Sequence, residues 1–534
     1  MEAEKANLPY SRREHRPGAG FYLRKAKTIP VRKIILDKIN NDIEPIRKLL
    51  DHVARDEKSI DAGGLTGAAR SFLTALLFER LEKLLLIVCP EEKDASSYAA
   101  DLALFLGKER VLYYPPLDFL AIDMFALQKE EALARLEVMT NLQVNEKIVV
   151  VTSVAALMQK VMPYKEFNQY LQVIAAGDSL DREQFGERLL AGGYRRVSLV
   201  EEKGEFSVRG NILDIFPPAE KSPLRLELFG DEIESIRRFD AATQLSTGEA
   251  AAFFVPPANE IVMNQEALEL AVRNIKRRAS ALALSRETRS RLVETLQSGL
   301  ANAINPIFLP LFYEAYEEES GFPQNRLSTF FDYLPQNTLV VLDDPLAARQ
   351  TARNTEGNID KLLFKARNSD KFYLDKESVY IDEGSIFTLL QKFPQINLTG
   401  LKLDESNAGE TAVVSFETYR DNYQEQVAAG VGKEDVLLRQ TAEKIKEWLS
   451  AGGKIFFLCS STEDLHRMQH LLAAYDLPIR LLPEDQSIMR HAFIYEEKAA
   501  LFLVEGKIST SFVFPALNLM FLSEEEIFGK KIQR

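Results

Sequence analysis

The first third of the chain alternates short, continuous apolar runs with stretches whose apolar residues recur at helical spacing. The runs at residues 84–88 and 148–151 have the length and aliphatic content of strands that are buried on both faces. A third run of this kind, at residues 338–342, ends in two acidic residues. Because such strands alternate with helices in parallel sheets, the pattern predicts an α/β unit. It also predicts that the strand at 338–343 lies in the same sheet as the strand at 84–88.

The pattern changes character several times along the rest of the chain. From about residue 160 to 250, shorter β-prone runs are separated by glycine-containing turns, and a charged helical stretch follows from about 265 to 300. Alternating helices and strands resume near residue 372. The predicted organisation is a flexible basic extension at 1–34, a parallel-sheet α/β lobe at 35–158 and 325–350, a small β-rich inserted domain at 159–248, a mainly helical domain at 249–324, a linker at 351–371 and a second, separate α/β domain at 372–528.

Composition narrows the class of protein. The 534 residues carry a formal charge of -13, so any contact with nucleic acid must be local. The two cysteines, Cys89 and Cys459, exclude a disulfide framework and a cysteine zinc site and fit a reducing cytoplasm. His466 and His470 share a helix face without a third ligand nearby, so we expect no metal site. No apolar run approaches the ~18 residues needed to cross a bilayer, and a cytoplasmic protein without a membrane partner is expected.

The segment from Gly64 to Ser71 has the outline of a phosphate-binding loop that precedes a helix. Such a loop needs a glycine that lets backbone N–H groups close around the phosphates, and a lysine whose slim ammonium reaches them. Ala69 and Arg70 stand at those two positions. Arg70 keeps the charge of lysine but not its shape. The sequence therefore predicts the fold of a nucleotide-driven, helicase-like motor without its catalytic residues.

A second altered motif agrees with the first. In motor proteins the acidic end of such a strand holds Mg²⁺ and positions water, and a glutamate normally follows the first carboxylate. Here Asp344 stands at that position and Pro345 follows it. We expect no catalytic residue in this chain. The predicted degenerate nucleotide site consists of Gly64, Thr66, Gly67, Ala69, Arg70, Ser71, Asp343 and Asp344.

Several long motifs carry a resemblance to known families. The run GEFSVRGNILDIFPP at 204–218, LRLELF at 224–229, DEIESI at 231–236, FD at 239–240 and FDYLP at 331–335 resemble UvrB and the transcription-repair coupling factor (Mfd) family. Together these motifs cover most of residues 60–345. They imply that the fold is a degenerate P-loop NTPase lobe interrupted by a small β-rich domain.

The choice between the two families depends on what the sequence lacks. UvrB-like proteins have an intact phosphate loop and an aromatic hairpin that enters damaged DNA, whereas a short turn at 115–118 and a helix-like run stand in the corresponding region here. The segments 505–512 and 521–529 resemble the end of the third domain of the coupling factors. The resemblance thus implies the amino-terminal part of a coupling factor, comprising domains 1A, 2, 1B and 3. In that family an RNA-polymerase-binding domain and a translocase follow.

The resemblance implies that the inserted domain binds UvrA. The positions that match the family's contact set are Arg195, Arg209, Arg225 and Glu227. Arginine forks pair bidentately with carboxylates and are common in interface hot spots, so these residue types suit a protein interface. On the residues alone, they would equally suit the solvated surface of a small β domain. Ser207 stands where UvrB-like chains carry a further arginine.

Two functional hypotheses follow from these observations. The first is a non-catalytic module that recruits UvrA to stalled RNA polymerase in transcription-coupled nucleotide excision repair, without ATPase activity. In the full-length parent, RNA polymerase, DNA and ATP with Mg²⁺ would be bound by the later domains. The second is a UvrB-like ATP-dependent DNA helicase or excision-repair component with residual nucleotide binding. Direct DNA binding by the lobe is a weaker third possibility because the chain is acidic.

Overall fold

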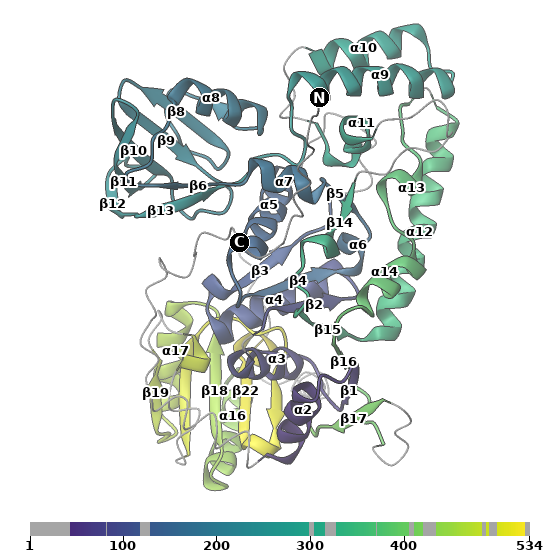
Figure 1. The fold of residues 1–534 in the computed structure, drawn as a ribbon. Coiled ribbons are helices and arrows are strands. Elements are labelled where there is room, and N and C mark those ends of the chain that lie inside the picture. The colour runs from purple at the N-terminus through teal and green to yellow at the C-terminus, as the bar shows by residue number, and fades with distance from the viewer. Residues whose placement is uncertain are drawn as a thin grey trace, which may run out of the picture.

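The architecture is described from a computed structural model of the chain. It describes residues 43–528 except residues 82, 118–128, 298–303, 315–326, 370, 405–410, 420–433, 483–486 and 491–498. The fold is a mixed α/β structure built around a large parallel sheet, with a smaller β-rich domain beside it and a second α/β sheet packed against it (Figure 1).

The central sheet has seven parallel strands in the order β17-β1-β16-β15-β2-β4-β3. Their bounds are β1 Ser59–Gly63, β2 Leu85–Cys89, β3 Val111–Tyr114, β4 Val149–Ser153, β15 Leu339–Asp343, β16 Gln395–Leu398 and β17 Ala412–Ser415. Strand β15 pairs with β2 in register, Leu339 opposite Leu85. The prediction that the acidic strand lies in the same sheet as residues 84–88 is therefore confirmed.

Helices cover both faces of this sheet. Side chains alternate along a buried strand, so Leu86 and Val340 face one core while Leu85 and Val341 face the other. The first core is closed by α5 Lys129–Val144, α6 Val154–Leu157, α12 Pro345–Arg367 and α14 Glu383–Leu390. The second is closed by α2 Glu44–Ala54, α3 Ala69–Arg80 and α4 Glu92–Leu106. The short helices η2 Lys108–Arg110 and α13 Lys376–Val379 lie between these elements in the chain.

Two segments differ from the organisation expected from the sequence. Strands β16 and β17 lie after residue 372, yet they belong to the central sheet, where they flank β1. Most of the expected linker is part of α12, which begins directly after the acidic end of β15. The central sheet therefore includes strands from a longer stretch of the chain than the apolar runs in the sequence predict.

The inserted domain has a six-stranded sheet in the order β12-β11-β10-β9-β8-β7. Its elements are β6 Gln172–Ala175, α8 Arg182–Ala191, β7 Arg195–Arg196, β8 Glu205–Arg209, β9 Ile212–Phe216, β10 Leu224–Phe229, β11 Glu232–Phe239, β12 Ser246–Glu249 and β13 Ala252–Val255. Phe185 and Leu189 of α8 pack on the apolar face of this sheet together with β6 and β13. An ion pair of 2.9 Å between Lys203 and Glu137 ties the domain to α5.

A mainly helical unit caps the upper end of the central sheet (Figure 1). It contains α9 Gln265–Ala281, α10 Arg286–Gln297, η4 Pro306–Phe308 and α11 Pro310–Tyr313. The adjoining elements are β5 Lys160–Val161, α7 Tyr164–Tyr170, β14 Ser328–Thr329 and η5 Phe330–Tyr333. Buried residues of this unit are continuous with the first core of the central sheet.

The carboxyl-terminal unit is a five-stranded sheet in the order β19-β20-β18-β22-β21. Its elements are α16 Glu434–Ser450, β18 Lys454–Cys459, α17 Thr462–Ala473, β19 Ile479–Leu481, η7 Ile488–Arg490, β20 Ala500–Glu505, β21 Phe512–Phe514, η9 Pro515–Leu517, β22 Leu519–Ser523 and α18 Glu524–Phe528. One face of this sheet joins the second core of the central sheet, against α3 and α4. The other face is covered by α16 and α17.

Candidate functional site

The altered phosphate loop, residues 64–68, connects β1 to α3. Gly64 and Gly67 both have positive φ, +78° and +52°, which suits glycine. The amide N–H of Thr66 donates to Oγ1 of Thr418 at 3.0 Å, and that of Ala68 donates to Oγ1 of Thr510 at 2.9 Å. Both acceptors come from distant parts of the chain. Backbone donors that would cradle phosphate oxygens in a working loop thus already have acceptors.

Arg70 turns back over the loop instead of projecting into an open site. Its Nε donates to the carbonyl oxygen of Leu65 at 3.1 Å, and its Nη1 lies 2.6 Å from Oδ1 of Asp343. Asp343 is almost completely buried at the end of β15. Burial raises the pKa of this carboxyl above its usual value, and the Arg70 guanidinium opposes that rise. The carboxylate that would hold Mg²⁺ in a motor protein is therefore paired with an arginine.

The two remaining polar residues of the predicted site also have internal partners. Asp344 has a positive φ of 46° and caps α12, where its Oδ1 accepts from the amide of Ala347 at 3.1 Å. Ser71 donates to the buried carboxylate of Asp101 at 3.3 Å. The eight predicted residues thus lie around one loop and the end of one strand. Within the described ranges, no group of three side chains suited to a metal ion occurs.

The second candidate site is the polar face of the insertion-domain sheet. Directly opposed residues on paired strands share a face. Arg195 is opposite Glu205, and along β8 the residues Glu205, Ser207 and Arg209 point the same way. On the next two strands, Asp214 is opposite both Ser207 and Arg225. Arg225 and Glu227 are two residues apart on β10 and therefore point to the same face. All four residues assigned to a partner contact thus lie on one face of the sheet.

A buried carboxylate organises the centre of this face. Asp214 has no exposed side-chain surface, and it accepts from Nη2 of Arg209 at 2.5 Å. It also accepts from Nε and Nη2 of Arg225, at 2.7 and 3.0 Å. The Arg225 guanidinium lies 4.6 Å from the centre of the Phe239 ring. Arg225 is therefore a largely internal group, 19% exposed, whereas 47% of the Arg209 side chain is exposed.

Arg195 and Glu227 lie on either side of this centre. Arg195 is 58% exposed and pairs with the buried Glu205 and, at 3.7 Å, with Glu202. Burial would raise the pKa of Glu205, but the amides of residues 201 and 202 and the Arg195 guanidinium hold it below its usual value. Glu227 accepts from the Ser235 hydroxyl at 3.0 Å. Arg195, Arg209 and Glu227 thus keep exposed surface that a partner can reach.

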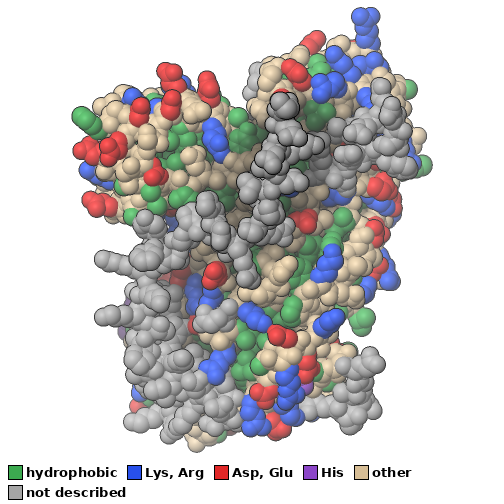
Figure 2. Space-filling view, in the orientation of Figure 1, with side chains coloured by type: hydrophobic (Ala, Val, Ile, Leu, Met, Phe, Trp, Pro, Cys, Tyr) green, Lys and Arg blue, Asp and Glu red, His purple; other side chains and the backbone are tan. Residues whose placement is uncertain are grey.

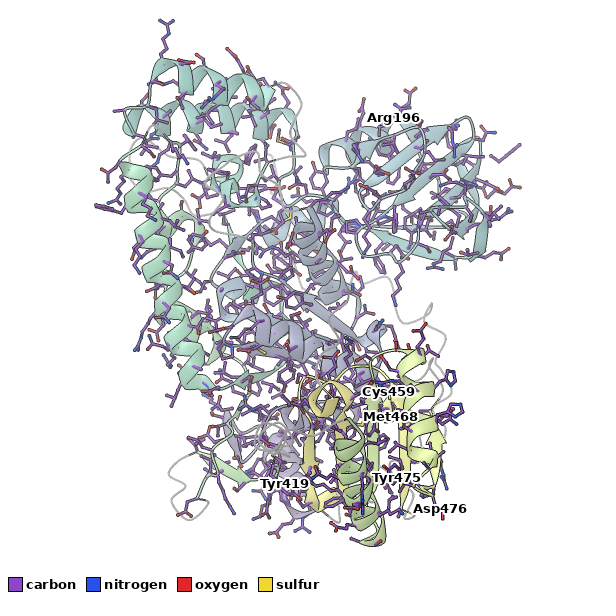
Figure 3. The ribbon with its side chains drawn as sticks, turned by 180° about the vertical axis from the view of Figure 1, so that it is seen from behind. Arg196, Tyr419, Cys459, Met468, Tyr475 and Asp476 are labelled. Atoms are coloured by element: carbon purple, nitrogen blue, oxygen red, sulfur yellow. The ribbon has the colours of Figure 1, made fainter. Side chains whose placement is uncertain are left out.

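Some residues of this face escaped the sequence analysis. Asp214 stands in a quoted motif as a polar residue between apolar neighbours, ILDIF, and that interruption was the available signal. Gln244 is a second such residue, because its Oε1 accepts from Nη2 of Arg225 at 3.4 Å. Arg196, labelled in Figure 3, is exposed on the edge strand β7. It is opposite Phe206, so its side chain belongs to the other face of the sheet and not to the polar face. Acidic side chains project along the outer rim of the domain (Figure 2).

The structure supports no membrane span within the residues it describes, because none of their helices is both long and apolar enough to cross a bilayer. The two histidines noted in the sequence, His466 and His470, lie exposed on α17. Among solved structures, that of S. tokodaii Xpd4 aligns with 89% of this chain and 80% of its own, at 10% identity and a TM-score of 0.20. A score this low carries no argument about function or fold.

Sequence comparisons give stronger likenesses. Residues 173–261 match the UvrB interaction domain family. The chain is 28% identical over 501 residues to the transcription-repair-coupling factor of Myxococcus xanthus, 26% over 476 residues to that of Escherichia coli and 23% over 481 residues to that of Bacillus subtilis. It spans only 38–40% of the length of these relatives. The resemblance predicted from the sequence is confirmed: the chain contains a match to the UvrB interaction domain and is similar, over 88–92% of its length, to part of the transcription-repair-coupling factors.

Proposed function

We propose that the chain is a UvrB-like module of a transcription-repair coupling factor that recruits UvrA to stalled RNA polymerase in transcription-coupled nucleotide excision repair. The observation that carries this proposal is the arrangement of the four assigned side chains on one polar face of the insertion-domain sheet. That sheet lies within the region that matches the UvrB interaction domain. RNA polymerase and DNA would be bound by other parts of the full-length protein.

The polar face suits an acidic partner surface. Arg195 and Arg209 each use part of a five-donor guanidinium on a carboxylate of their own domain, and both remain about half exposed. Such a preordered arginine loses less side-chain freedom when it pairs with a second carboxylate. Arg225 would act indirectly in this arrangement, since its bidentate contact with Asp214 fixes the group to which Arg209 is tied.

We propose further that this module has no ATPase activity of its own. The alternative, a UvrB-like helicase with residual nucleotide binding, requires free loop amides and a carboxylate available to Mg²⁺. In the described residues the amides of Thr66 and Ala68 have hydroxyl acceptors, and Asp343 pairs with Arg70. These contacts favour the non-catalytic module.

A titration of UvrA into the chain tests the proposed contact. Arg195→Ala removes an exposed arginine of the polar face, and Arg196→Ala is the matched control because it removes the adjacent exposed arginine that points away from that face. We expect calorimetry to give at least a tenfold weaker affinity for Arg195→Ala and an unchanged affinity for Arg196→Ala, in line with the cost of ~1.4 kcal/mol per decade. Equal affinities for the two variants, or no binding by the wild type, would remove the polar face from the proposal.

A further inference from the structure

The altered phosphate loop lies against the carboxyl-terminal α/β unit. Thr510, in the turn between β20 and β21, places its Oγ1 on the amide of Ala68. Thr418, which follows β17, accepts from the amide of Thr66 and donates to the carbonyl oxygen of Gly64 at 2.7 Å. The loop is therefore held on two sides by hydroxyl groups from residues that follow it by more than 350 positions.

A second polar contact lies beside the first and uses the same turn. Asp101 of α4 is 2% exposed and accepts from the amide of Ser509 at 2.8 Å and from its hydroxyl at 2.6 Å. The hydroxyl of Ser71, the residue at the Mg²⁺-binding position of the loop motif, lies 3.3 Å from the same carboxylate. Residues 509 and 510 thus bind α4 and the loop together.

At this contact the backbone of each unit lies close to a side chain of the other. A Cβ added to Gly67 would lie 2.0 Å from Oγ1 of Thr510, and one added to Gly506 would lie 2.6 Å from Cδ1 of Leu104. Separations under about 3 Å are not tolerated without movement of one partner. A side chain at Gly67 or Gly506 would therefore require Thr510 or Leu104 to move, and at Gly67 it would also be strained by the positive φ of 52°.

Buried aromatic rings continue the interface beneath the polar contacts. The Phe72 ring on α3 lies 5.3–6.0 Å, between ring centres, from those of Phe512, Phe514 and Phe521. Phe105 on α4 meets Phe521 edge to face at 5.6 Å. These rings belong to one core shared by the two sheets. Tyr419, which follows Thr418 and is labelled in Figure 3, adds a backbone link through its bridge with Val513.

We propose that the altered phosphate loop is a docking socket for the turn at residues 509–510, and that this contact fixes the two α/β units as one rigid body. The Thr510 and Thr418 hydroxyls take acceptor positions on loop amides of the kind that phosphate oxygens occupy in working loops. In a nucleotide-driven motor the cleft beside this loop opens and closes. Here the chain itself fills it, so the carboxyl-terminal unit holds a constant orientation.

Hydrogen exchange tests the socket in the full chain. The variant Thr510→Val keeps the side-chain shape but removes the acceptor of the Ala68 amide. We expect exchange of that amide to quicken by about tenfold, the size of one net hydrogen bond, with α9 and α10 unchanged. The matched control is Thr388→Val on the exposed face of α14, where the Thr388 hydroxyl donates to the carbonyl oxygen of Gly384 in the same helix. It should leave the Ala68 amide unchanged.

A distance measurement tests the rigid-body part. Spin labels at Asp51 of α2 and His470 of α17, both exposed, report the orientation of the two units. The labelled wild type should give one narrow distance, with or without Mg-ATP, and Thr418→Val/Ser509→Ala/Thr510→Val should broaden it while far-UV circular dichroism stays unchanged. Unchanged exchange at Ala68 in Thr510→Val, or a broad wild-type distance, would overturn the proposal. So would an unbroadened distance in the folded triple variant.

Discussion

The pair formed by Arg70 and Asp343 gives a quantitative prediction about the altered nucleotide site. Arg70→Ala would remove the arginine that pairs with Asp343, a carboxylate that is 9% exposed and has no other ion-pair partner among the described residues. Removing one member of a buried ion pair typically costs ~3–5 kcal/mol because the other charge stays desolvated. The Arg70 side chain is 21% exposed, so water screens part of the interaction. We expect Arg70→Ala to lower the free energy of unfolding by roughly 2–4 kcal/mol.

Urea unfolding followed by far-UV circular dichroism measures this loss. The double variant Arg70→Ala/Asp343→Asn should recover about half of it, since the amide carries no charge to desolvate. The pKa of Asp343 is already raised by burial, so the loss in the single variant should shrink as the pH falls and the carboxyl is protonated. Arg353→Ala is the control, because that arginine is 61% exposed and 3.7 Å from Glu383. A loss below about 0.5 kcal/mol for Arg70→Ala, the usual range of surface changes, would show that the pair is solvated and the site open.

Three further predictions concern nucleotide, pH and the polar face. Calorimetry should detect no Mg-ATP binding tighter than about millimolar, roughly 4 kcal/mol; a micromolar dissociation constant would contradict the account of the loop. Burial raises the pKa of Asp101 from 3.8 to about 6, so the folded state takes up a proton there. The stability that comes from the protonated Asp101 carboxyl in the folded state is fully present below pH 3.8 and is lost as the pH rises to about 6. Urea titrations from pH 4 to 6 should therefore show a steeper loss in wild type than in Asp101→Asn; parallel pH curves would refute this. Arg209→Ala should cost less than about 1 kcal/mol of stability, because Arg225 still pairs with Asp214, yet it should weaken UvrA binding about a hundredfold. Arg209→Glu should in addition unfold more readily, because it sets a second carboxylate beside Asp214. Equal melting temperatures for the two variants would contradict this prediction.

The central strands were predictable because their environment leaves a strong mark on the sequence. Strands β2, β4 and β15 are buried on both faces, so each is a continuous aliphatic run. Strands β16 and β17 are four residues each, with the mixed sequences QINL and AVVS, and their place beside β1 follows from tertiary pairing that no local pattern specifies. The N-terminus of helix α8, in contrast, has a local sequence signal, because Asp181 is an N-cap residue.

Each candidate site likewise has a part that the local sequence predicts and a part that only the fold brings together. The loop substitutions Ala69 and Arg70 could be identified from spacing alone, but what fills the site could not. Thr510 and Thr418 are single hydroxyl residues hundreds of positions from the loop, and only the fold brings them to its amides. On the polar face, the register of β8, β9 and β10 turns scattered charges into one network around Asp214. A sequence shows which residues are polar but not which of them share a buried partner.

Amide hydrogen exchange of the chain with and without saturating UvrA tests the central claim most directly. The proposed function predicts slower exchange in β7 and β8, which carry Arg195 and Arg209, and in the residues 197–204 that connect them. It predicts no change in α9 and α10, which lie in a different unit. Protection confined to the helical or carboxyl-terminal unit, or no protection at a UvrA concentration that saturates binding, would contradict the assignment of the insertion domain as the UvrA contact.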